Sequence, residues 1–351
     1  MGLGITIAVN GSADMELNRA TNVEVYEMMG KTTGYSIRFD VDISKGDIPL
    51  LADKRLDVGS ELSILVPMGN KTHCLVKGPV HGHKIHLVHG GAGSWLEVKG
   101  SDNSIVMDRE TKSAVWSGTD SDAVNSILGS YGYTPDVQST KAGHPENKHT
   151  LIQRETDLRF VHRLARRNGF LFWITSDGSG SETAHFKRPP IDESAAAELI
   201  INLESPSLQT LDITWDVERP TSVEGEQLDL NSKTKLDGSV AQTPRSILGD
   251  KGLKAITNDK RSVHVSAPAD DAGDMQSRGE GALIEADWFI RAACQASPGQ
   301  LNALVRAHTI VNLRGVGKRH SGKYFVSSVR HTIDASSHQM EIELLRNGWG
   351  A

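Results

Sequence analysis

Cysteine is scarce in this sequence. Only two of the 351 residues are cysteine, Cys74 and Cys294, and they lie far apart in the chain. A disulfide-stapled scaffold or a structural zinc site needs cysteines in closely spaced groups, so the sequence fits neither kind of protein. We expect two buried or idle thiols in the reducing cytoplasm.

The chain also has no net positive charge and no long apolar run. The formal net charge is −6, whereas a protein that binds nucleic acid through its phosphates carries a basic patch or stripe. Residues 1–18 lack the basic start and apolar core of a signal peptide, and no stretch reaches the roughly 20 apolar residues of a membrane span. The sequence therefore predicts a chain that binds no specific nucleic acid, does not insert into membranes and has no signal peptide.

Aromatic residues make up only 5% of the chain, whereas glycine is abundant at 34 residues. Frequent glycine indicates many turns and hence many strands. Apolar residues alternate with small or polar ones in several short segments, which is typical of half-buried antiparallel strands. These segments lie at residues 5–9, 35–43, 61–66, 73–78, 85–88 and 95–100. Residues 1–115 are therefore predicted to form a first small β-barrel domain.

Helices are predicted in the next part of the chain, residues 116–195. Thr119 can cap the first helix with its hydroxyl group, and Asn168 ends the second, which has an apolar stripe along one face. The predicted elements are helices from residue 120 and over 156–168, a strand at 170–174 and a turn at 176–181. We interpret this part as a helix-containing α+β domain.

The remaining residues are interpreted as a second β-barrel domain with an insertion. Strand patterns lie at residues 208–217, 223–230, 324–329 and 340–345. Residues from about 232 to 281 are polar and predicted to be loops, and a helix is predicted from about 281 to 294. The second β-barrel domain is thus assigned to residues 196–240 and 306–351, and the loop and helix insertion to 241–305. The fold class is α+β, mostly β.

Histidines gather in one stretch of the first domain. The group consists of His73, Cys74, His81, His83, His86 and His89. His81 and His83 are predicted to share one strand face, a spacing that can chelate a metal ion. A metal site also needs a fixed second shell and ligands from further elements, and this stretch contains no carboxylate. We interpret the group as surface histidines on a hairpin and predict no metal ligand.

Carboxylates occur in three close pairs, which a hydrolase could use for acid and base catalysis. The pairs are Asp120 with Asp122, Asp270 with Asp271, and Glu341 with Glu343. The first fits a helix cap, the second lies in a polar loop, and the third lies on the outward face of a strand. A hydrolase needs two carboxylates across one cleft, so we predict no catalytic residue.

The other motifs do not indicate a catalytic site either. The glycine-rich stretches at residues 90–93 and 315–317 lack the lysine of a phosphate-binding loop and are interpreted as turns. Neither GxSxG nor HExxH is present. Arg163, Arg166 and Arg167 are predicted to lie on a solvated or interface face of one helix. We predict no cofactor and no cofactor-binding residue.

Several stretches resemble phage late control protein D and the VgrG hubs of contractile injection systems. The most specific is residues 149–174, where a Gln, a Glu and an Asp precede a helix and an aromatic strand. Its matching residues are Gln153, Glu155, Asp157, Phe160, Arg163, Leu164, Gly169 and Phe172. Residues 116–133, 315–331 and 341–347 resemble further family segments, and residues 228–235 resemble the family's second-barrel hairpin more loosely.

The resemblance implies an architecture and a set of partners. It implies a homotrimer in which two pseudo-symmetric β-barrels per chain form a pseudo-sixfold ring with a central channel. The ring would join a hexameric inner tube protein to a trimeric spike protein, beside other baseplate and adaptor proteins, and cargo would lie in or pass the channel. Because the chain ends soon after the last expected strand, the spike is expected on a separate polypeptide. The protein would assemble in the cytoplasm and become part of a phage tail or injection particle.

Two other functions remain open from the residues alone. A particle-associated cell-wall hydrolase or toxin would need a cleft with converging polar groups, and a peptidoglycan-release assay would detect its turnover. A β-rich carbohydrate-binding module would present exposed aromatic platforms, and a glycan array would detect its ligands. The few aromatics of this chain lie mostly in apolar runs.

Overall fold

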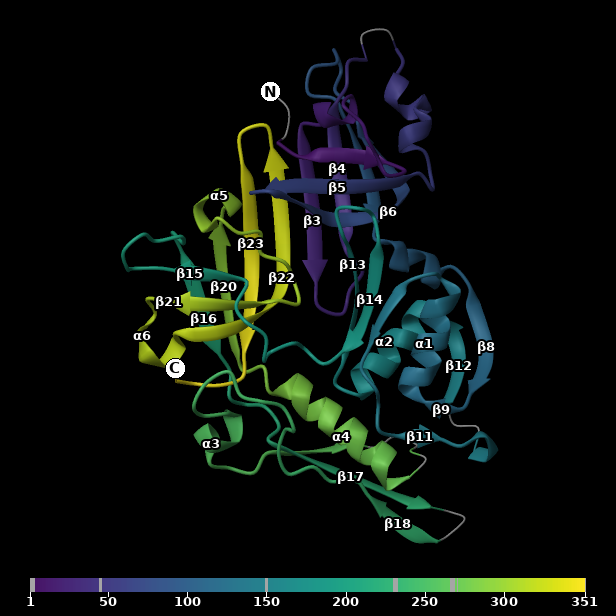
Figure 1. Cartoon of the computed structure of the whole chain (residues 1–351), viewed down its shortest axis with the longest axis vertical. Coiled ribbons are helices and arrows are strands. Elements are labelled where there is room, and N and C mark those ends of the chain that lie inside the picture. Colours follow the sequence, from purple (N-terminus) through teal and green to yellow (C-terminus); the bar gives the residue numbers. More distant parts are fainter. Residues whose placement is uncertain are drawn as a thin grey trace.

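A large β-sheet forms the frame of the molecule (Figure 1). The structure is a computed structural model that describes residues 4–43, 46–148, 151–229, 233–265, 269 and 271–350. The sheet has 13 strands. They are β1 (Thr6–Val9), β2 (Ser12–Ala13), β3 (Asn22–Met28), β4 (Gly34–Asp40), β5 (Glu61–Met68), β6 (Lys71–His86), β7 (Trp95–Ser101), β15 (Ala197–Ile200), β16 (Leu211–Trp215), β20 (Ile290–Ala296), β21 (Ile310–Arg314), β22 (Gly322–Asp334) and β23 (His338–Arg346).

The strand order shows how the two ends of the chain combine. It runs β16-β20-β23-β22-β3-β4-β7-β6-β5-β1-β2, and β21 pairs with β22 and β15. The antiparallel pairing of β22 with β3 joins the C-terminal strands to the N-terminal ones. Each side has its own hydrophobic core, one built around β3 to β7 and the other around β20 to β23. The prediction of a mostly β chain is confirmed. The two predicted β-units are joined in one 13-stranded sheet, and their description as two small barrels stays a prediction.

Alternating burial explains why these segments become strands. In β4 the side chains of Tyr35, Ile37 and Phe39 are buried, and the residues between them face outward. In β23 the side chains of Met340 and Ile342 are buried, whereas Glu341 and Glu343 are exposed. This period of two is the repeat of side chains along a strand, and the sequence shows it directly. The outward position predicted for Glu341 and Glu343 is confirmed.

A compact α+β lobe lies beside the sheet (Figure 1). Its elements are β8 (Thr111–Trp116), β9 (Gly118–Thr119), α1 (Asp120–Ser130), β10 (Thr134–Val137), β11 (Gly143–His144), β12 (Leu151–Thr156), α2 (Asp157–Arg167), β13 (Leu171–Ser176) and β14 (Glu182–Lys187). The two predicted helices are confirmed within one or two residues. The Thr119 side chain takes part in a capping box with Asp122, and Asn168 ends α2 before Gly169, whose φ is +65°.

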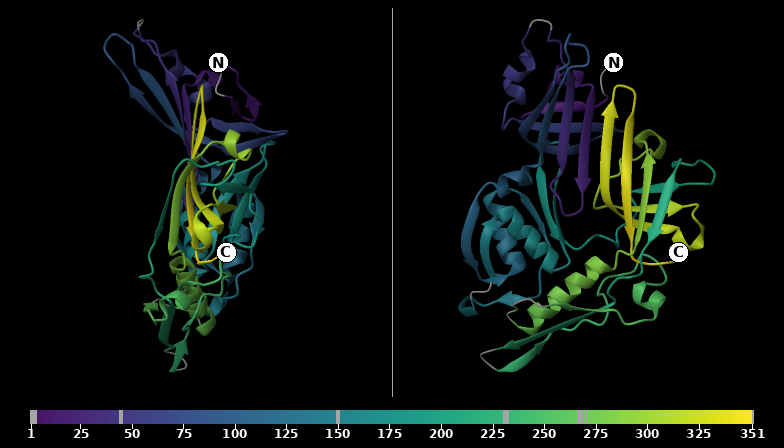
Figure 2. Two further views of the ribbon diagram at one scale, coloured as in Figure 1. Left: turned by 90° about the vertical axis from the view of Figure 1, so that its left-hand side faces the viewer. Right: turned by 180° about the vertical axis from the view of Figure 1, so that it is seen from behind.

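A third group of elements lies at the end of the long axis opposite the N-terminal strands, as Figures 1 and 2 show. It contains β17 (Ser222–Asp229), β18 (Thr234–Asp237), β19 (Ser262–Val265), α3 (Leu253–Thr257) and α4 (Ala272–Ala286). The strand predicted at 223–230 is present as β17, but β17 pairs with β18 and β19 and does not join the large sheet. The shorter helices are α5 (Pro298–Leu301), α6 (Gly317–His320) and the 3₁₀ turns η1 (Leu17–Arg19), η2 (Pro49–Ala52), η3 (Lys54–Leu56), η4 (Asn103–Asp108) and η5 (Glu146–Lys148).

The helix predicted from about residue 281 to 294 is wrong in position. The helix α4 ends at Ala286, and residues 290–296 form β20 between β16 and β23 of the large sheet. Buried residues alternate strictly with exposed ones along β20, from Ile290 to Ala296. Leu283, Phe289 and Ile290 have a spacing that fits an apolar helical stripe, and this spacing explains the wrong prediction. Part of the segment assigned to an insertion, 241–305, thus belongs to the main sheet.

The polar stretch predicted as loops, residues 232 to 281, is only partly loop. It contains β18, α3, β19 and most of α4. These elements escape detection because they are short or rich in glycine and charge, so their apolar periodicity is weak.

The two cysteines are both free and buried, as predicted. Burial in apolar surroundings raises the pKa of the Cys74 thiol to about 11 and that of Cys294 to about 12, so both stay protonated and unreactive at neutral pH. Within the described ranges, none of the helices has the length and apolar character needed to cross a membrane.

Candidate functional site

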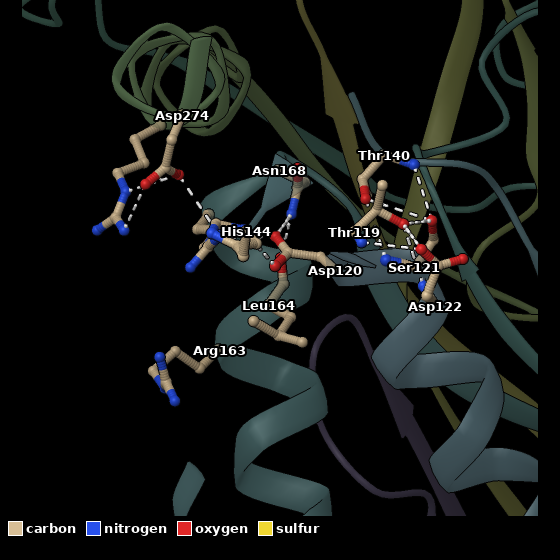
Figure 3. A network of polar contacts seen from close by, with 12 residues as sticks. Thr119, Asp120, Ser121, Asp122, Thr140, His144, Arg163, Leu164, Asn168 and Asp274 are labelled. Carbon is tan, nitrogen blue, oxygen red and sulfur yellow. Dashed lines mark hydrogen bonds and ion pairs between the residues drawn. The ribbon is translucent and has the colours of Figure 1, made fainter. Parts of the chain in front are cut away.

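Buried charged side chains gather where the lobe meets α4 (Figure 3). Asp120 begins α1, His144 lies in β11, Arg167 and Asn168 end α2, and Asp274 lies in the first turn of α4. The two aspartate side chains are 1% exposed, and that of Arg167 is 10% exposed. Four segments distant in sequence therefore meet in one polar network that water barely reaches.

Asp120 is the centre of this network. Its Oδ2 accepts from Arg167 Nε at 2.8 Å and from Asn168 Nδ2 at 2.7 Å. Its Oδ1 lies 3.2 Å from His144 Nε2, which also contacts the Arg167 guanidinium. A buried carboxylate is stable only when its charge is paired and its lone pairs accept hydrogen bonds. The contacts of Oδ2 meet both needs, whereas Oδ1 has no hydrogen-bond partner among the described residues.

Arg167 carries the network across to α4. Its Nη2 lies 3.4 Å from Asp274 Oδ1, and Asp274 in turn pairs with Arg278 one turn later in the helix, at 3.1 Å. Gly281 allows this approach, because a Cβ at that position would lie 2.7 Å from the carbonyl oxygen of Arg167. Ion pairing and close backbone packing together fix α4 against the end of α2.

The structure separates residues that the sequence had grouped. Asp122 caps α1 as predicted, because its Oδ2 accepts from the Thr119 amide at 2.8 Å. Asp120 is no mere cap but the centre of the buried network. Arg166 is exposed and pairs with Glu285, and Arg163 points away from Asp120 in Figure 3 and pairs with Glu155. These arginines were predicted to lie on a solvated or interface face. Arg167 takes the interface alternative, because its side chain is 10% exposed and packs against Asp120 and Asp274.

This network has the residue types of an acid–base site, but a substrate has no open path to them. His144 is 2% exposed, and the Asp120 carboxylate is enclosed by its own partners. Two aspartates and two arginines balance in charge. A substrate cannot reach groups that are covered in this way, so the arrangement holds elements together.

The residues behind the family resemblance form a second buried contact set within the lobe. Gln153 is fully buried, donates to Asp157 Oδ1 at 2.7 Å, and accepts from Trp116 Nε1 at 3.0 Å. Asp157 Oδ2 also accepts from Tyr131 at 2.7 Å and from Lys112. The polar residues of the motif thus anchor the start of α2 on the strands β8 and β12. Residues 149–150 of the resembling stretch lie outside the described residues.

A further ion pair, whose acid is buried and whose arginine is half-buried, joins the two β-units. Arg306 lies before β21 and pairs with Glu27 of β3, which is 4% exposed. The Arg306 guanidinium also donates to the carbonyl oxygens of Cys74 and Leu75 in β6, each at 2.8 Å. The second carboxylate oxygen of Glu27 accepts from the Ala307 amide at 2.8 Å. No sequence pattern links Arg306 to the strands β3 and β6, since it lies more than 200 positions from Glu27, Cys74 and Leu75.

An aromatic stack attaches the lobe to the sheet. Trp173 of β13 lies between His308, at 4.4 Å between ring centroids, and His185 of β14, at 4.6 Å. His308 is 8% exposed and has a φ of +66°. His185 Nδ1 lies 2.7 Å from Asp136 Oδ2. His308 was not predicted, because a single histidine outside the strands and helices belongs to no sequence pattern.

Burial of His308 predicts a stability that falls in mild acid. Burial lowers the pKa of this imidazole to about 3, below about 6.5 in the unfolded chain. The folded state therefore disfavours protonation, so its stability is complete above pH 6.5 and is lost as pH falls toward 3. From pH 7 to pH 5 we expect a loss of about 2 kcal/mol from this group. Urea unfolding at a series of pH values measures it.

The variant His308→Asn provides the comparison, because asparagine tolerates the left-handed backbone and does not titrate. It should lower stability at pH 7 through loss of the stack and flatten the decline between pH 6.5 and 5. His89 is exposed, and His89→Asn should leave the profile unchanged. Buried His331 and half-buried His338 act in the same direction, so an unaltered slope in His308→Asn would assign the acid sensitivity to them instead.

The histidine group of the first domain has separate partners. His81 Nε2 lies 3.0 Å from Ser101 Oγ, His83 Nε2 lies 2.7 Å from the Leu56 carbonyl oxygen, and His86 stacks on Trp95. A register shift in β6 between Val80 and Gly82 interrupts the alternation that placed His81 and His83 on one face. In the described part of the chain, no three His, Cys, Asp or Glu residues cluster in a way that could hold a metal ion.

The remaining carboxylate pair of the sequence is Asp270 with Asp271. Asp271 caps α4 by accepting from the Asp274 amide at 2.8 Å, and Asp270 lies outside the described residues. Asp271 therefore has a structural role at the start of the helix.

Comparisons with known proteins concern the whole chain. The family model of the Alg8 N-terminal domain matches residues 2–335. The tail protein from Neisseria meningitidis MC58 aligns with a TM-score of 0.65 and 13% identity, over 100% of this chain and 98% of that chain. The 43 kDa tail protein of prophage MuSo2 from Shewanella oneidensis aligns with a TM-score of 0.64 and 13% identity, over 97% of each chain. No curated protein matches the chain.

A bacterial secretion protein shares the fold as well. The E. coli protein c3393, described as a component of the type VI secretion system with structural similarity to T4 bacteriophage tail proteins, aligns with a TM-score of 0.59 and 12% identity. The alignment covers 98% of this chain and 79% of that chain. At such identities the likeness concerns the fold, and at that level the predicted resemblance to tail and injection-system proteins is confirmed.

Proposed function

We propose that this chain, which belongs to the Alg8 N-terminal domain family, is a structural component of a phage tail or contractile injection particle, because it has the fold of phage tail proteins. One observation carries this proposal. Its fold matches two tail proteins over nearly the whole of both chains. We expect a chain with the same fold over its whole length to take part in the same kind of assembly.

Within such a particle the chain acts as the baseplate hub. Its two β-units correspond to two small barrels, the first within residues 1–115 and the second built from β15, β16 and β20 to β23. Each unit has its own hydrophobic core. Three chains would then place six similar units around one axis, which matches a hexameric inner tube on one side and a trimeric spike on the other. The ring encloses a central channel for cargo.

The buried junctions support this role. A symmetry adaptor must hold its two β-units at a fixed angle, because an error in that angle is repeated in every chain of the ring. The pairing of Arg306 with Glu27 joins the units directly, and the network around Asp120 fixes α4 to the lobe. The role is structural and not enzymatic, and its partners are the spike protein, the tube protein and neighbouring baseplate and adaptor proteins.

Light scattering coupled to size exclusion tests the proposal. The purified protein should have the mass of three chains at micromolar concentration, since stable interfaces bury about 1,000 Å² or more. Mass spectrometry of purified particles should find the chain together with tube and spike proteins.

Two kinds of result would contradict the proposed hub role. A strictly monomeric protein at high concentration that is also absent from purified particles would contradict the hub role. Release of soluble fragments from peptidoglycan by the purified protein, or a specific glycan on an array, would replace it with the hydrolase or the carbohydrate-binding function.

A further inference from the structure

A cavity of about 240 Å³ lies where the lobe meets α4 and the turn between β3 and β4. The last turns of α2 and the start of β13 form one side of it, the turn after β3 forms a second, and the end of α4 forms a third. Its walls are mostly apolar or aromatic, and their main side chains are Met29, Ala165, Phe170, Phe172, Ile284 and Trp288. Since an apolar cavity of about 150 Å³ can hold benzene, this one has room for a substituted aromatic ring.

The aromatic wall of the cavity is held in place by its own contacts. Trp288 stacks on Phe325 at 5.4 Å between ring centroids, and the Cζ atom of Arg245 lies 3.8 Å from the centre of the Trp288 ring. Met29 lines the opposite element with a thioether side chain, which makes favourable contacts with aromatic rings. A ligand ring would therefore meet a wall that is already formed, together with one adaptable side chain.

His162 of α2 is a polar group of this lining that has no partner. It contacts Phe172 edge to face at 5.4 Å, but neither of its ring nitrogens forms a hydrogen bond with any residue that the structure describes. The side chain is half-buried and neither nitrogen is completely enclosed, so a ligand can reach it. Burial lowers the pKa of His162, which leaves the ring neutral at pH 7 with one N–H donor and one acceptor.

The charges at the cavity favour an uncharged ligand. Arg166 and Glu285 also belong to the lining, but both are exposed and they pair with each other at 3.2 Å. An ionic ligand would lose part of its hydration in an apolar cavity whose only charged groups are already paired. A neutral ring with a single hydroxyl group loses less and gains a hydrogen bond to the imidazole.

We propose that this cavity binds a neutral phenol ring, packed against Met29, Phe170 and Trp288, with its hydroxyl group hydrogen-bonded to His162. The phenol has two natural sources, a free phenolic molecule or the tyrosine side chain of another protein. The site does not depend on the role of the chain in a particle.

Nuclear magnetic resonance with matched ligands tests this site in the full chain. The protein carries ¹⁵N-labelled tryptophan, and the indole N–H signal of Trp288, assigned with Trp288→Phe, reports on the cavity. p-Cresol should shift this signal and should bind about fivefold more tightly than toluene, which lacks only the hydroxyl group. Benzoate, an anionic ring of similar size, should leave the signal unchanged.

A further titration separates the two sources of the phenol. p-Cresol is the side chain of tyrosine alone, and N-acetyl-tyrosinamide adds the neutral main-chain groups on both sides. Tighter binding of N-acetyl-tyrosinamide would identify a tyrosine of another protein as the ligand, and tighter binding of p-cresol would identify a free phenol.

Variants make the assignment specific. His162→Phe keeps an aromatic ring but removes both nitrogens, so it should abolish the preference for p-cresol over toluene while toluene still binds. Met29→Trp should fill the cavity and prevent binding of both ligands. The matched controls are His89→Phe and Met15→Trp, at an exposed histidine and an exposed methionine, and they should bind both ligands as the unaltered chain does.

Three results would overturn the proposal. The first is an unshifted Trp288 signal at about 5 mM p-cresol. The second is binding of benzoate as tight as that of p-cresol. The third is an unaltered preference for p-cresol over toluene in His162→Phe, a readout that a purely structural role of His162 would not change.

Discussion

Asp120→Ala is expected to lower the free energy of unfolding by about 3 kcal/mol, since it breaks a buried ion pair and leaves part of the Arg167 charge uncompensated. Arg167 would retain Asp274 at 3.4 Å, so the loss lies at the lower end for such changes. Asn168 would retain its bond to the Leu164 carbonyl oxygen at 2.8 Å. Urea unfolding followed by fluorescence measures the change, and limited proteolysis should show α4 released before the lobe unfolds.

Asp122→Ala is the matched control, because it removes an acid from the same helix turn that takes part only in the cap. It should cost about 1 kcal/mol, the usual value for a lost N-terminal cap. In the double variant Asp120→Asn with Arg167→Gln, the loss should be smaller than the sum of the two single losses, because neither charge remains unpaired. If Asp120→Ala costs no more than Asp122→Ala, the network does not hold α4 to the lobe.

Gly315→Ala is expected to destabilise the second β-unit by at least about 3 kcal/mol, more than usual overpacking, because the obstacle is backbone. A Cβ at this position would lie 1.6 Å from the carbonyl oxygen of Ile201. The Ile201 amide also donates to the Arg314 carbonyl oxygen at 3.1 Å, so the strand pair β15–β21 would have to open. Thermal unfolding measures the loss, and hydrogen exchange should place it in these two strands.

Gly317→Ala provides the comparison, two residues along the same turn. Both glycines have positive φ, +89° for Gly315 and +76° for Gly317, but no atom lies within 4 Å of a Cβ at Gly317. Its substitution should cost only the backbone strain, about 1 kcal/mol. Equal losses in the two variants would mean that strain alone, and not the close approach of Ile201, explains the need for glycine at 315.

Much of the fold was predictable where one physical pattern dominates a segment. The stripe of α2 and the alternation in β4 and β23 repeat at the periods that helices and strands require, so the bounds of these elements were predicted to within three residues. Residues 281–294 were misassigned because Leu283, Phe289 and Ile290 fit a helical stripe, while the alternation from Ile290 to Ala296 fits a strand. Pairing with β16 and β23 decided between them.

The buried polar sites were far less predictable. Asp120 and Asp122 both stand at a helix start, and the sequence does not distinguish their roles. Asp120 becomes the centre of a network only because Arg167 and His144 from other segments contact it. Arg245 and Asp287 stand more than 40 positions apart, and nothing in either neighbourhood suggests that they form a buried ion pair. Burial of charge depends on what the rest of the chain brings to the same place.

By itself, the sequence determined the class of the fold, the caps and stripes of its two main helices, and most of its long strands, because these depend on neighbours within one or two turns. It also determined the glycine-rich turn at residues 315–317. Only the tertiary structure decided that both β-units share one sheet, that Arg306 and Glu27 join them, and that the Asp120 network fixes α4. These contacts depend on long-range packing, which no local period encodes and which lowers the free energy only once the whole chain has folded.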